Sequence, residues 1–168
     1  MPKFKQAVDS VLRTICIVLF AVLVLLVCWQ ILTRLVFNDP SVWSEEASRY
    51  TFIWLSLIGI SVATGERADV AIDLLVRKIP VVAQRWVTAV AYLSSIAFAT
   101  VFMVYGGYLN AVLAWNQSNP ILPVKQGVLY LGVPVAGILL TFYLGYHFFR
   151  IITAEENVAA PEEMQVEL

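Results

Sequence analysis

Charged residues are scarce in this sequence, and hydrophobic residues take their place. Asp, Glu, Lys and Arg make up 14% of the 168 residues, whereas average soluble domains contain about 25%. The hydrophobic share of 60% excludes an ordinary soluble domain, and it also excludes a disordered chain, which would be polar and rich in charge. The net charge of −1 offers no basic field, so nucleic acid is not expected as a partner.

Histidine and cysteine are almost absent as well. His147 is the only histidine, whereas a haem held between helices needs histidines that face each other. Cys16 and Cys28 lie in one apolar run, about 18 Å apart along a helix axis, which is too far for a disulfide. The sequence contains no phosphate-binding glycine loop, no HExxH motif and no nucleophile elbow. We therefore expect neither an enzyme nor a metal or cofactor site.

What the sequence does contain is four long apolar segments, each close to the ~20 residues that a helix needs to cross a membrane. The first runs without a charge from Thr14 to Thr33, and the second, from Tyr50 to Gly65, is extended by Trp43 and Ala47. Four such segments cannot close a barrel, so they predict helices. We expect an all-α integral membrane protein whose four transmembrane helices span about residues 14–35, 43–65, 86–115 and 127–149.

The distribution of lysine and arginine predicts the orientation, because cytoplasmic segments carry an excess of both. With the N-terminus inside, eight of the eleven basic residues lie in the cytoplasm and three lie outside. The inside set is Lys3, Lys5, Arg13, Arg67, Arg77, Lys78, Arg85 and Arg150, and the outside set is Arg34, Arg49 and Lys125. Residues 1–152 then form the membrane domain, and residues 153–168 form an acidic, flexible cytoplasmic tail.

The link between the second and third spans has an amphipathic pattern, which predicts a short helix on the inner membrane surface. Its aliphatic face holds Ile72, Leu75, Val76 and Ile79, and its charged face holds Asp69, Asp73 and Arg77. A surface ion pair between Asp73 and Arg77 is one interpretation of that face. The other is an anchor to lipid headgroups, formed by Asp73, Arg77, Lys78 and Arg85.

The most distinctive stretch lies at the outer end of the second span. Asn38 or Asp39 is expected to cap this helix, with Pro40 in its first position. Glu45 and Arg49 are four residues apart, the favourable order for a helical ion pair worth about 0.3–0.5 kcal/mol. Spacing alone favours a helix entry with interfacial aromatic residues. The functional alternative is a docking surface formed by Trp43, Glu45, Glu46 and Arg49.

Small and polar residues within the spans predict close helix contacts, either inside the chain or with a partner. The small-residue candidates are Gly59 and Ala63 in the second span, with Gly137, Thr141 and Gly145 in the fourth. Pro134 predicts a tolerated kink. Gln30 and Asn110 are expected to make interhelical hydrogen bonds.

The uncharged cores of the four spans contain no ionisable residue, although ion-coupled transporters usually place one there. A membrane subunit that serves another protein therefore fits better than a transporter acting alone. Two alternatives stay open: a small homo-oligomeric transporter, which should carry a carboxylate within a span, and a haem or quinone subunit, which should carry paired histidines or loop cysteines.

Several of these residues resemble a known family, the small membrane subunit (DctQ-like) of tripartite ATP-independent periplasmic (TRAP) transporters. The resemblance extends from about Ile15 to Phe149. Its strongest part is Trp43-Ser44-Glu45-Glu46 and Arg49, followed by Phe52-Ile53-Trp54 and Leu57-Ile58-Gly59; Asp73, Asn119-Pro120-Ile121-Leu122 and Pro134 also match. One departure is Asp69, which stands where the family often has a histidine four residues before the acidic position.

The resemblance implies a function. In such systems a periplasmic binding protein captures an organic acid, and a large membrane subunit (DctM-like) moves it across the inner membrane, driven by a sodium gradient. The small subunit binds the large one and acts as a fixed scaffold. The outer segment from Trp43 to Arg49 would then meet the binding protein, and Trp54 with Pro134 and the small residues would pack helices or contact the large subunit.

Overall fold

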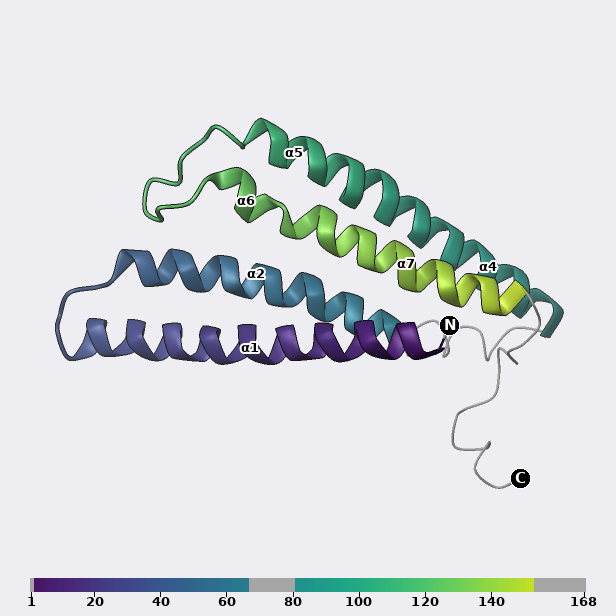
Figure 1. The fold of residues 1–168 in the computed structure, drawn as a ribbon, viewed down its shortest axis with the longest axis horizontal. Helices are drawn as coiled ribbons and strands as arrows, with labels where there is room; N and C mark the ends of the chain where they lie inside the picture. The colour runs from purple at the N-terminus through teal and green to yellow at the C-terminus, as the bar shows by residue number, and fades with distance from the viewer. Residues whose placement is uncertain (1, 67–80, 153–168) are drawn as a thin grey trace, which may run out of the picture.

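The computed structural model describes residues 2–66 and 81–152, and every regular element in these two ranges is a helix. The helices are α1 (Pro2–Leu35), α2 (Val42–Gly65), α4 (Val81–Phe98), the π-helix η1 (Ala99–Gly106), α5 (Gly107–Leu113), α6 (Gln126–Tyr130) and α7 (Gly132–Ile152). The segments α4, η1 and α5 follow one another without a gap and form one long helix (Figure 1). A turn at Leu131 separates α6 from α7.

Three of the four expected spans are confirmed as helices that are long and apolar enough to cross a membrane. Within the described residues they are Lys5–Leu35, Trp86–Leu113 and Gln126–Phe149. The 24 residues of α2 would cover the ~30 Å hydrocarbon core at ~1.5 Å per residue. However, Glu45, Glu46 and Arg49 make its first two turns polar. The crossing of the membrane by α2 therefore stays a prediction.

The helices lie side by side in the order α1, α2, α7 and α4–η1–α5. Figure 1 shows that α1 with α2, and α7 with α4, form two hairpins that meet near the N-terminus and separate toward the opposite end. We call the first end, with Lys5, Asp9 and Gly65, the basal end. The opposite end, with the turn at residues 36–41 and the loop at residues 114–125, is the distal end.

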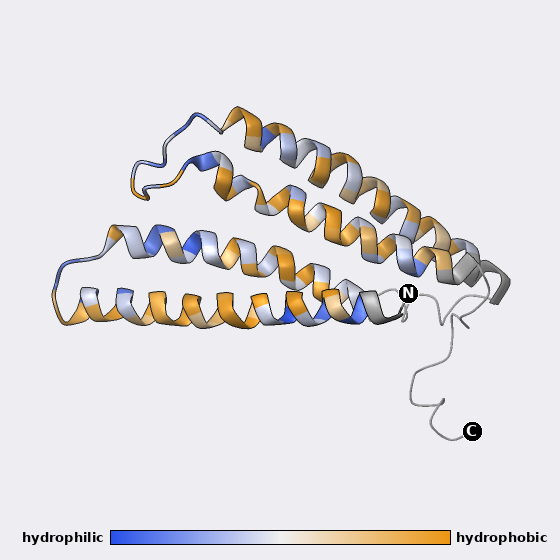
Figure 2. Cartoon of the chain, in the orientation of Figure 1, coloured by the Kyte–Doolittle hydropathy of each residue, from blue (hydrophilic) through white to orange (hydrophobic). Residues whose placement is uncertain are grey.

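Small residues dominate the buried core, and large apolar residues face outward. Ala99, Ala111, Ala114 and Ala136 are among the few buried hydrophobic residues, whereas aliphatic and aromatic side chains are exposed along every long helix. Figure 2 shows apolar residues along the helices and polar residues at their ends. Such a surface needs lipid or protein around it, and the small residues let the helix backbones approach closely.

The π-helix η1 aligns the buried faces of α4 and α5. Ala99 and Gly107 are both buried but eight residues apart, and in a regular α-helix at about 100° per residue they would point about 80° apart. A π-turn absorbs about one extra residue, which brings Gly107 back to the side of Ala99. Ala111 and Ala114 then continue the same buried face.

The expected start of α2 is wrong by two residues. The helix begins at Val42, with Ser41 as the N-cap, whereas Asn38 adopts a left-handed conformation with φ 50°. Asn tolerates that conformation better than most residues, so Asn38 reverses the chain after α1 instead of capping α2. The Ser41 carbonyl accepts a hydrogen bond from the Ser44 hydroxyl at 2.8 Å.

Two further sequence predictions lie outside the described residues. They are the amphipathic inner helix, with Asp69, Asp73, Arg77 and Lys78, and the tail at residues 153–168. Arg85 belongs to α4.

Candidate functional site

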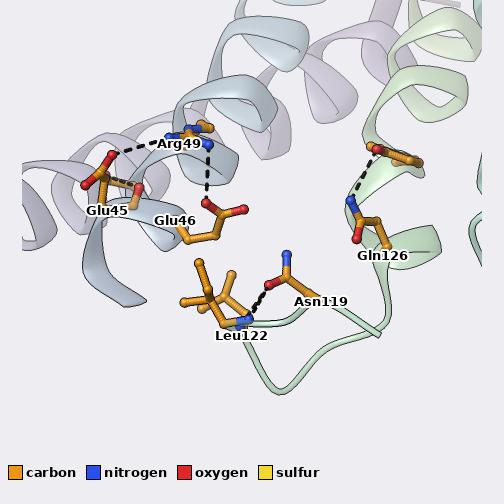
Figure 3. A network of polar contacts seen from close by, with 9 residues as sticks. Glu45, Glu46, Arg49, Asn119, Leu122 and Gln126 are labelled. Carbon is orange, nitrogen blue, oxygen red and sulfur yellow. Dashed lines mark hydrogen bonds and ion pairs between the residues drawn. The ribbon is translucent and has the colours of Figure 1, made fainter. Parts of the chain in front are cut away.

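The distal end of α2 holds the acidic and basic motif that the sequence singles out. Arg49 contacts both acids, with its two terminal nitrogens 3.3 Å from Glu45 Oε1 and 3.3 Å from Glu46 Oε2 (Figure 3). The Arg49 and Glu45 side chains are each 59% exposed, whereas Glu46 is 16% exposed. The exposed pair of Arg49 with Glu45 contributes at most about 1 kcal/mol to stability, so these two side chains are better suited to presenting charge than to holding the fold.

The distal loop lies beside this motif and has a defined shape. The Asn119 side chain is buried, and its Oδ1 accepts hydrogen bonds from the backbone N–H groups of Ile121 and Leu122, both at 2.9 Å. Gln126 N donates to Gln117 O at 2.9 Å and closes the base of the loop. Figure 3 shows Asn119 and Leu122 on the side of Glu46. The family-like segment from Asn119 to Leu122 therefore sets the shape of the loop tip.

A cleft of about 290 Å³ separates the two hairpins below the loop tip. It is lined by Leu19 of α1, Ala47, Tyr50, Thr51 and Trp54 of α2, Leu122, Pro123 and Val124 of the loop, and Leu129 of α6. We call it the distal cleft. Its lining is mainly apolar, and it places the loop tip directly over the first turns of α2.

Below the cleft, α2 and α7 contact each other through small residues. A Cβ added to Gly132 would lie 3.1 Å from the Trp54 ring, so Trp54 packs directly on this glycine. Ser61 Oγ lies 3.5 Å from the carbonyl oxygen of Ala136, and both residues are fully buried. Trp54 therefore packs between α2 and α7 within the chain, and its expected contact with a partner stays a prediction.

The other face of α7 packs against η1. A Cβ on Gly137 would lie 2.8 Å from Met103 Cβ, and the Thr141 hydroxyl lies 3.4 Å from that of Thr100. Pro134 is buried and faces Gly107, where an added Cβ would lie 2.9 Å from the proline Cδ. Gly137, Thr141 and Pro134 thus serve contacts inside the chain.

Gly59 and Gly145 do not take part in these contacts, because a Cβ added to either would have no atom within 4 Å. Ala63, four residues after Gly59, is only half-buried. Gly59 of the small-residue pattern in α2 therefore makes no close helix contact within this chain. The contacts of α2 with α7 use Ser61 and Gly65 instead.

A group of polar contacts ties three helices together at the basal end. The Tyr143 hydroxyl donates to the Asp9 carboxylate, Lys5 Nζ donates to the Gly65 carbonyl at 2.8 Å, and Arg13 pairs with Glu66. Tyr143 is fully buried with Leu12 and Ile58, and a Cβ on Gly65 would lie 2.7 Å from its ring. We call Lys5, Asp9, Arg13, Gly65, Glu66 and Tyr143 the basal clamp. It joins α1 and α2 to α7.

The sequence prediction missed most of the contacts that hold the hairpins together: Ser61, Gly65, Gly132, Ala136 and Tyr143. Their signal was available as a pattern, because Trp54, Ser61 and Gly65 recur on one helical face, as do Gly132, Ala136 and Tyr143. The expected interhelical hydrogen bonds of Gln30 and Asn110 are absent among the described residues, where neither side chain has a hydrogen-bond partner and Asn110 is exposed.

The residues that the structure describes include no group of three or more His, Cys, Asp or Glu side chains that could hold a metal ion. What the fold presents is a set of apolar helices, an exposed charged motif at one end and a polar clamp at the other. These features define an all-helical membrane protein with large exposed apolar surfaces.

Comparison with known families agrees with that class. The family described as "Tripartite ATP-independent periplasmic transporters, DctQ component" matches residues 23–154. The chain belongs to this family, and it is therefore a TRAP transporter small permease subunit and not an enzyme.

Two small permease relatives are similar to this chain over most of their length, and one longer permease is similar over a fifth of its length. A putative TRAP transporter small permease protein of Haemophilus influenzae is 29% identical over 144 residues, which cover 86% of this chain and 89% of the relative. The sialic acid TRAP transporter small permease protein SiaQ of Vibrio cholerae is 28% identical over 82% of this chain and 79% of its own. The sialic acid TRAP transporter permease protein SiaT of Haemophilus influenzae is 27% identical over 77% of this chain, but over only 20% of its own length.

Proposed function

We propose that this chain is a scaffold subunit that binds the large membrane subunit of a TRAP transporter and supports sodium-driven uptake of an organic acid. The observation that carries the proposal is the match to SiaT, in which a small-permease-like segment makes up a fifth of a longer permease. A segment joined to a large permease in one chain is expected to contact it when the two are separate chains. The exposed apolar faces of the helices supply the surface for that contact.

The proposed topology places the chain in the bacterial inner membrane with four crossings and both termini in the cytoplasm. The basal end is then cytoplasmic and the distal end periplasmic. Two observations support this orientation: Lys5 and Arg13 lie at the basal end, and the helical hairpins begin and end there. Because α2 contacts both α1 and α7, its 24 residues run parallel to two candidate spans, which supports a fourth crossing.

The basal end is also the proposed site of attachment to lipid headgroups. The described residues at the end of α2 and at the start of α4 both lie at the basal end. In the sequence, Asp73, Arg77 and Lys78 fall between these two helices, and Arg85 belongs to α4. A cluster of basic residues at the cytoplasmic surface is attracted to anionic lipids by about 1 kcal/mol per residue.

The distal motif is the proposed docking surface for the periplasmic binding protein. Trp43 is 51% exposed beside the triad of Glu45, Glu46 and Arg49. We expect the double variant Glu46→Ala, Arg49→Ala to lower uptake about fivefold at subsaturating binding protein, which corresponds to about 1 kcal/mol of docking free energy. Uptake into proteoliposomes with purified binding protein measures the effect.

The matched control for this motif is Arg34→Ala with Asp39→Ala, which removes one base and one acid from the same end of the molecule. This control should leave uptake unchanged, and a rise in binding-protein concentration should restore uptake in the motif variant. Equal uptake by the motif variant and the control at every concentration would exclude the docking function.

Co-purification tests the proposed function as a whole. The chain, tagged at its C-terminus, is extracted from native membranes in mild detergent, and bound proteins are identified by mass spectrometry. We expect one large polytopic permease at a stoichiometric amount. A stable homo-oligomer without such a partner would contradict the scaffold function and favour the small self-sufficient transporter.

A further inference from the structure

The second hairpin is interrupted twice at the same level along its length. In its first helix, the π-helix η1 replaces α-helical hydrogen bonds between Ala99 and Gly106. In its second helix, a turn at Leu131 separates α6 from α7, and Pro134 follows three residues later. Pro134 has no N–H group, so the carbonyl of Tyr130 lacks its α-helical donor. Mid-helix π-segments and proline kinks are places where helices bend.

The two interruptions pack against each other. Gly107, at the end of η1, faces Pro134, and Gly137 faces Met103 and Val104 of η1. A Cβ on Gly107 or Gly137 would lie within 3 Å of these neighbours, so the backbones meet closely at this level. A bend at either interruption would therefore act on the other helix, and the two interruptions together define a hinge line across the hairpin.

The part of the hairpin beyond this line is rigid within itself. We call α5, the loop at residues 114–125 and α6 the distal block. Gly127 packs on backbone, where an added Cβ would lie 2.6 Å from Ala111 O and 2.8 Å from Trp115 Cα. Gly127 N donates to Ala114 O at 3.1 Å, and Asn119 fixes the loop tip. These contacts leave the distal block able to move only as one body.

The distal block has space to move into. It borders the distal cleft of about 290 Å³, whose far wall is Ala47, Tyr50 and Thr51 of α2. The two hairpins meet again at Trp54 and Gly132, next to the hinge line, and farther on at the basal clamp. The basal part of the molecule is thus held at several points, whereas the distal block meets α2 across the cleft and through one side-chain hydrogen bond, between Tyr50 of α2 and Asn119 of the loop.

We propose that the distal block is a lid, which turns as one body about η1 and the Leu131–Pro134 break and closes the distal cleft against α2. The lid carries the loop that lies beside the Glu46–Arg49 motif. Any effect of lid closure on transport rests on the proposed function of that motif as a docking surface. Closing the lid changes the surface that the periplasmic binding protein meets.

Distance measurements between paired spin labels test the lid in lipid nanodiscs, with the full chain alone and with its co-purified permease. The background replaces the two native cysteines, Cys16→Ala and Cys28→Ala. The distal pair is Phe37→Cys with Pro120→Cys, and the basal pair is Gln6→Cys with Phe149→Cys; all four positions are exposed. We expect a broad or two-peaked distribution for the distal pair and one narrow peak for the basal pair.

Two straightened variants complete the test. Deletion of Val101, which is 53% exposed, removes the extra residue of the π-turn while keeping the register of the buried faces. Pro134→Ala restores the missing hydrogen bond, and Val135→Ala on the same helix is the control. We expect either straightened variant to narrow the distance distribution of the distal label pair, and we expect the control to leave that distribution broad.

The lid proposal would be overturned if the distance distributions of the two label pairs had equal widths. It would also be overturned if neither straightened variant changed the distribution of the distal pair. Because the chain alone gives the same readout, failure to find a permease partner would remove the proposed function and leave this test intact.

Discussion

Replacing Gly127 by alanine is expected to destabilise the helical bundle by about 1–3 kcal/mol, the usual cost of overpacking. The added methyl group would lie 2.6 Å from Ala111 O and 2.8 Å from Trp115 Cα. Both are backbone atoms, so no side chain can rotate away, and α6 must separate from the end of α5. The free energy of unfolding, measured by titration with denaturing detergent and followed by circular dichroism, gives the effect.

Gly145→Ala is the matched control, because it makes the same chemical change in α7 where no atom lies within 4 Å. Alanine favours a helix over glycine by about 0.5–1 kcal/mol, so this variant should be slightly more stable than the wild type. The two variants are therefore expected to shift stability in opposite directions. A Gly127→Ala variant as stable as Gly145→Ala would show that α5 and α6 do not approach as closely as described.

The second large effect is expected at the basal clamp. Tyr143→Phe removes the hydroxyl that donates to Asp9, and the carboxylate then loses a partner in a part-buried position. Hydrogen bonds to charged groups contribute about 1.5–3 kcal/mol, so a loss of that size is expected. Tyr108→Phe is the control, since Tyr108 is 58% exposed and should be neutral.

A double-mutant cycle separates this bond from other effects of the substitutions. If Tyr143 and Asp9 act as a pair, Tyr143→Phe should cost much less in an Asp9→Ala background than in the wild type. If the losses in unfolding free energy from the two substitutions simply add, the contribution of the Tyr143 hydroxyl to stability does not depend on Asp9.

The sequence was a good guide to which segments are helical, because long apolar runs between polar turns leave few alternatives in a membrane. It was a poor guide to which faces meet. Gly59 with Ala63 and Gly137 with Thr141 have the same spacing, yet Gly137 and Thr141 both meet η1, whereas a Cβ added to Gly59 would have no atom within 4 Å. In lipid, both faces of a helix are apolar, so hydrophobic periodicity does not mark the inner one.

The π-helix was missed for a related reason. Helical periodicity assumes 3.6 residues per turn. The extra residue of the π-turn changes this pattern only by shifting the buried positions by one residue between Ala99 and Gly107. The start of α2 was misplaced because Asn38 suits both a cap and a left-handed turn, and only the path of the chain after α1 decides between them. The ion pair between Glu45 and Arg49 is present, as the i, i+4 spacing predicts.

The basal clamp also has a consequence for the order of biogenesis. Lys5 and Arg13 find their partners at Gly65 and Glu66, so the hairpin of α1 and α2 has its basal contacts within the first 66 residues. It can close while the ribosome is still synthesising the rest of the chain. Asp9, in contrast, must wait for Tyr143, which emerges 134 residues later. Until then a carboxylate stays without its donor, so an incomplete chain carries a polar defect that quality-control proteases in the membrane can recognise.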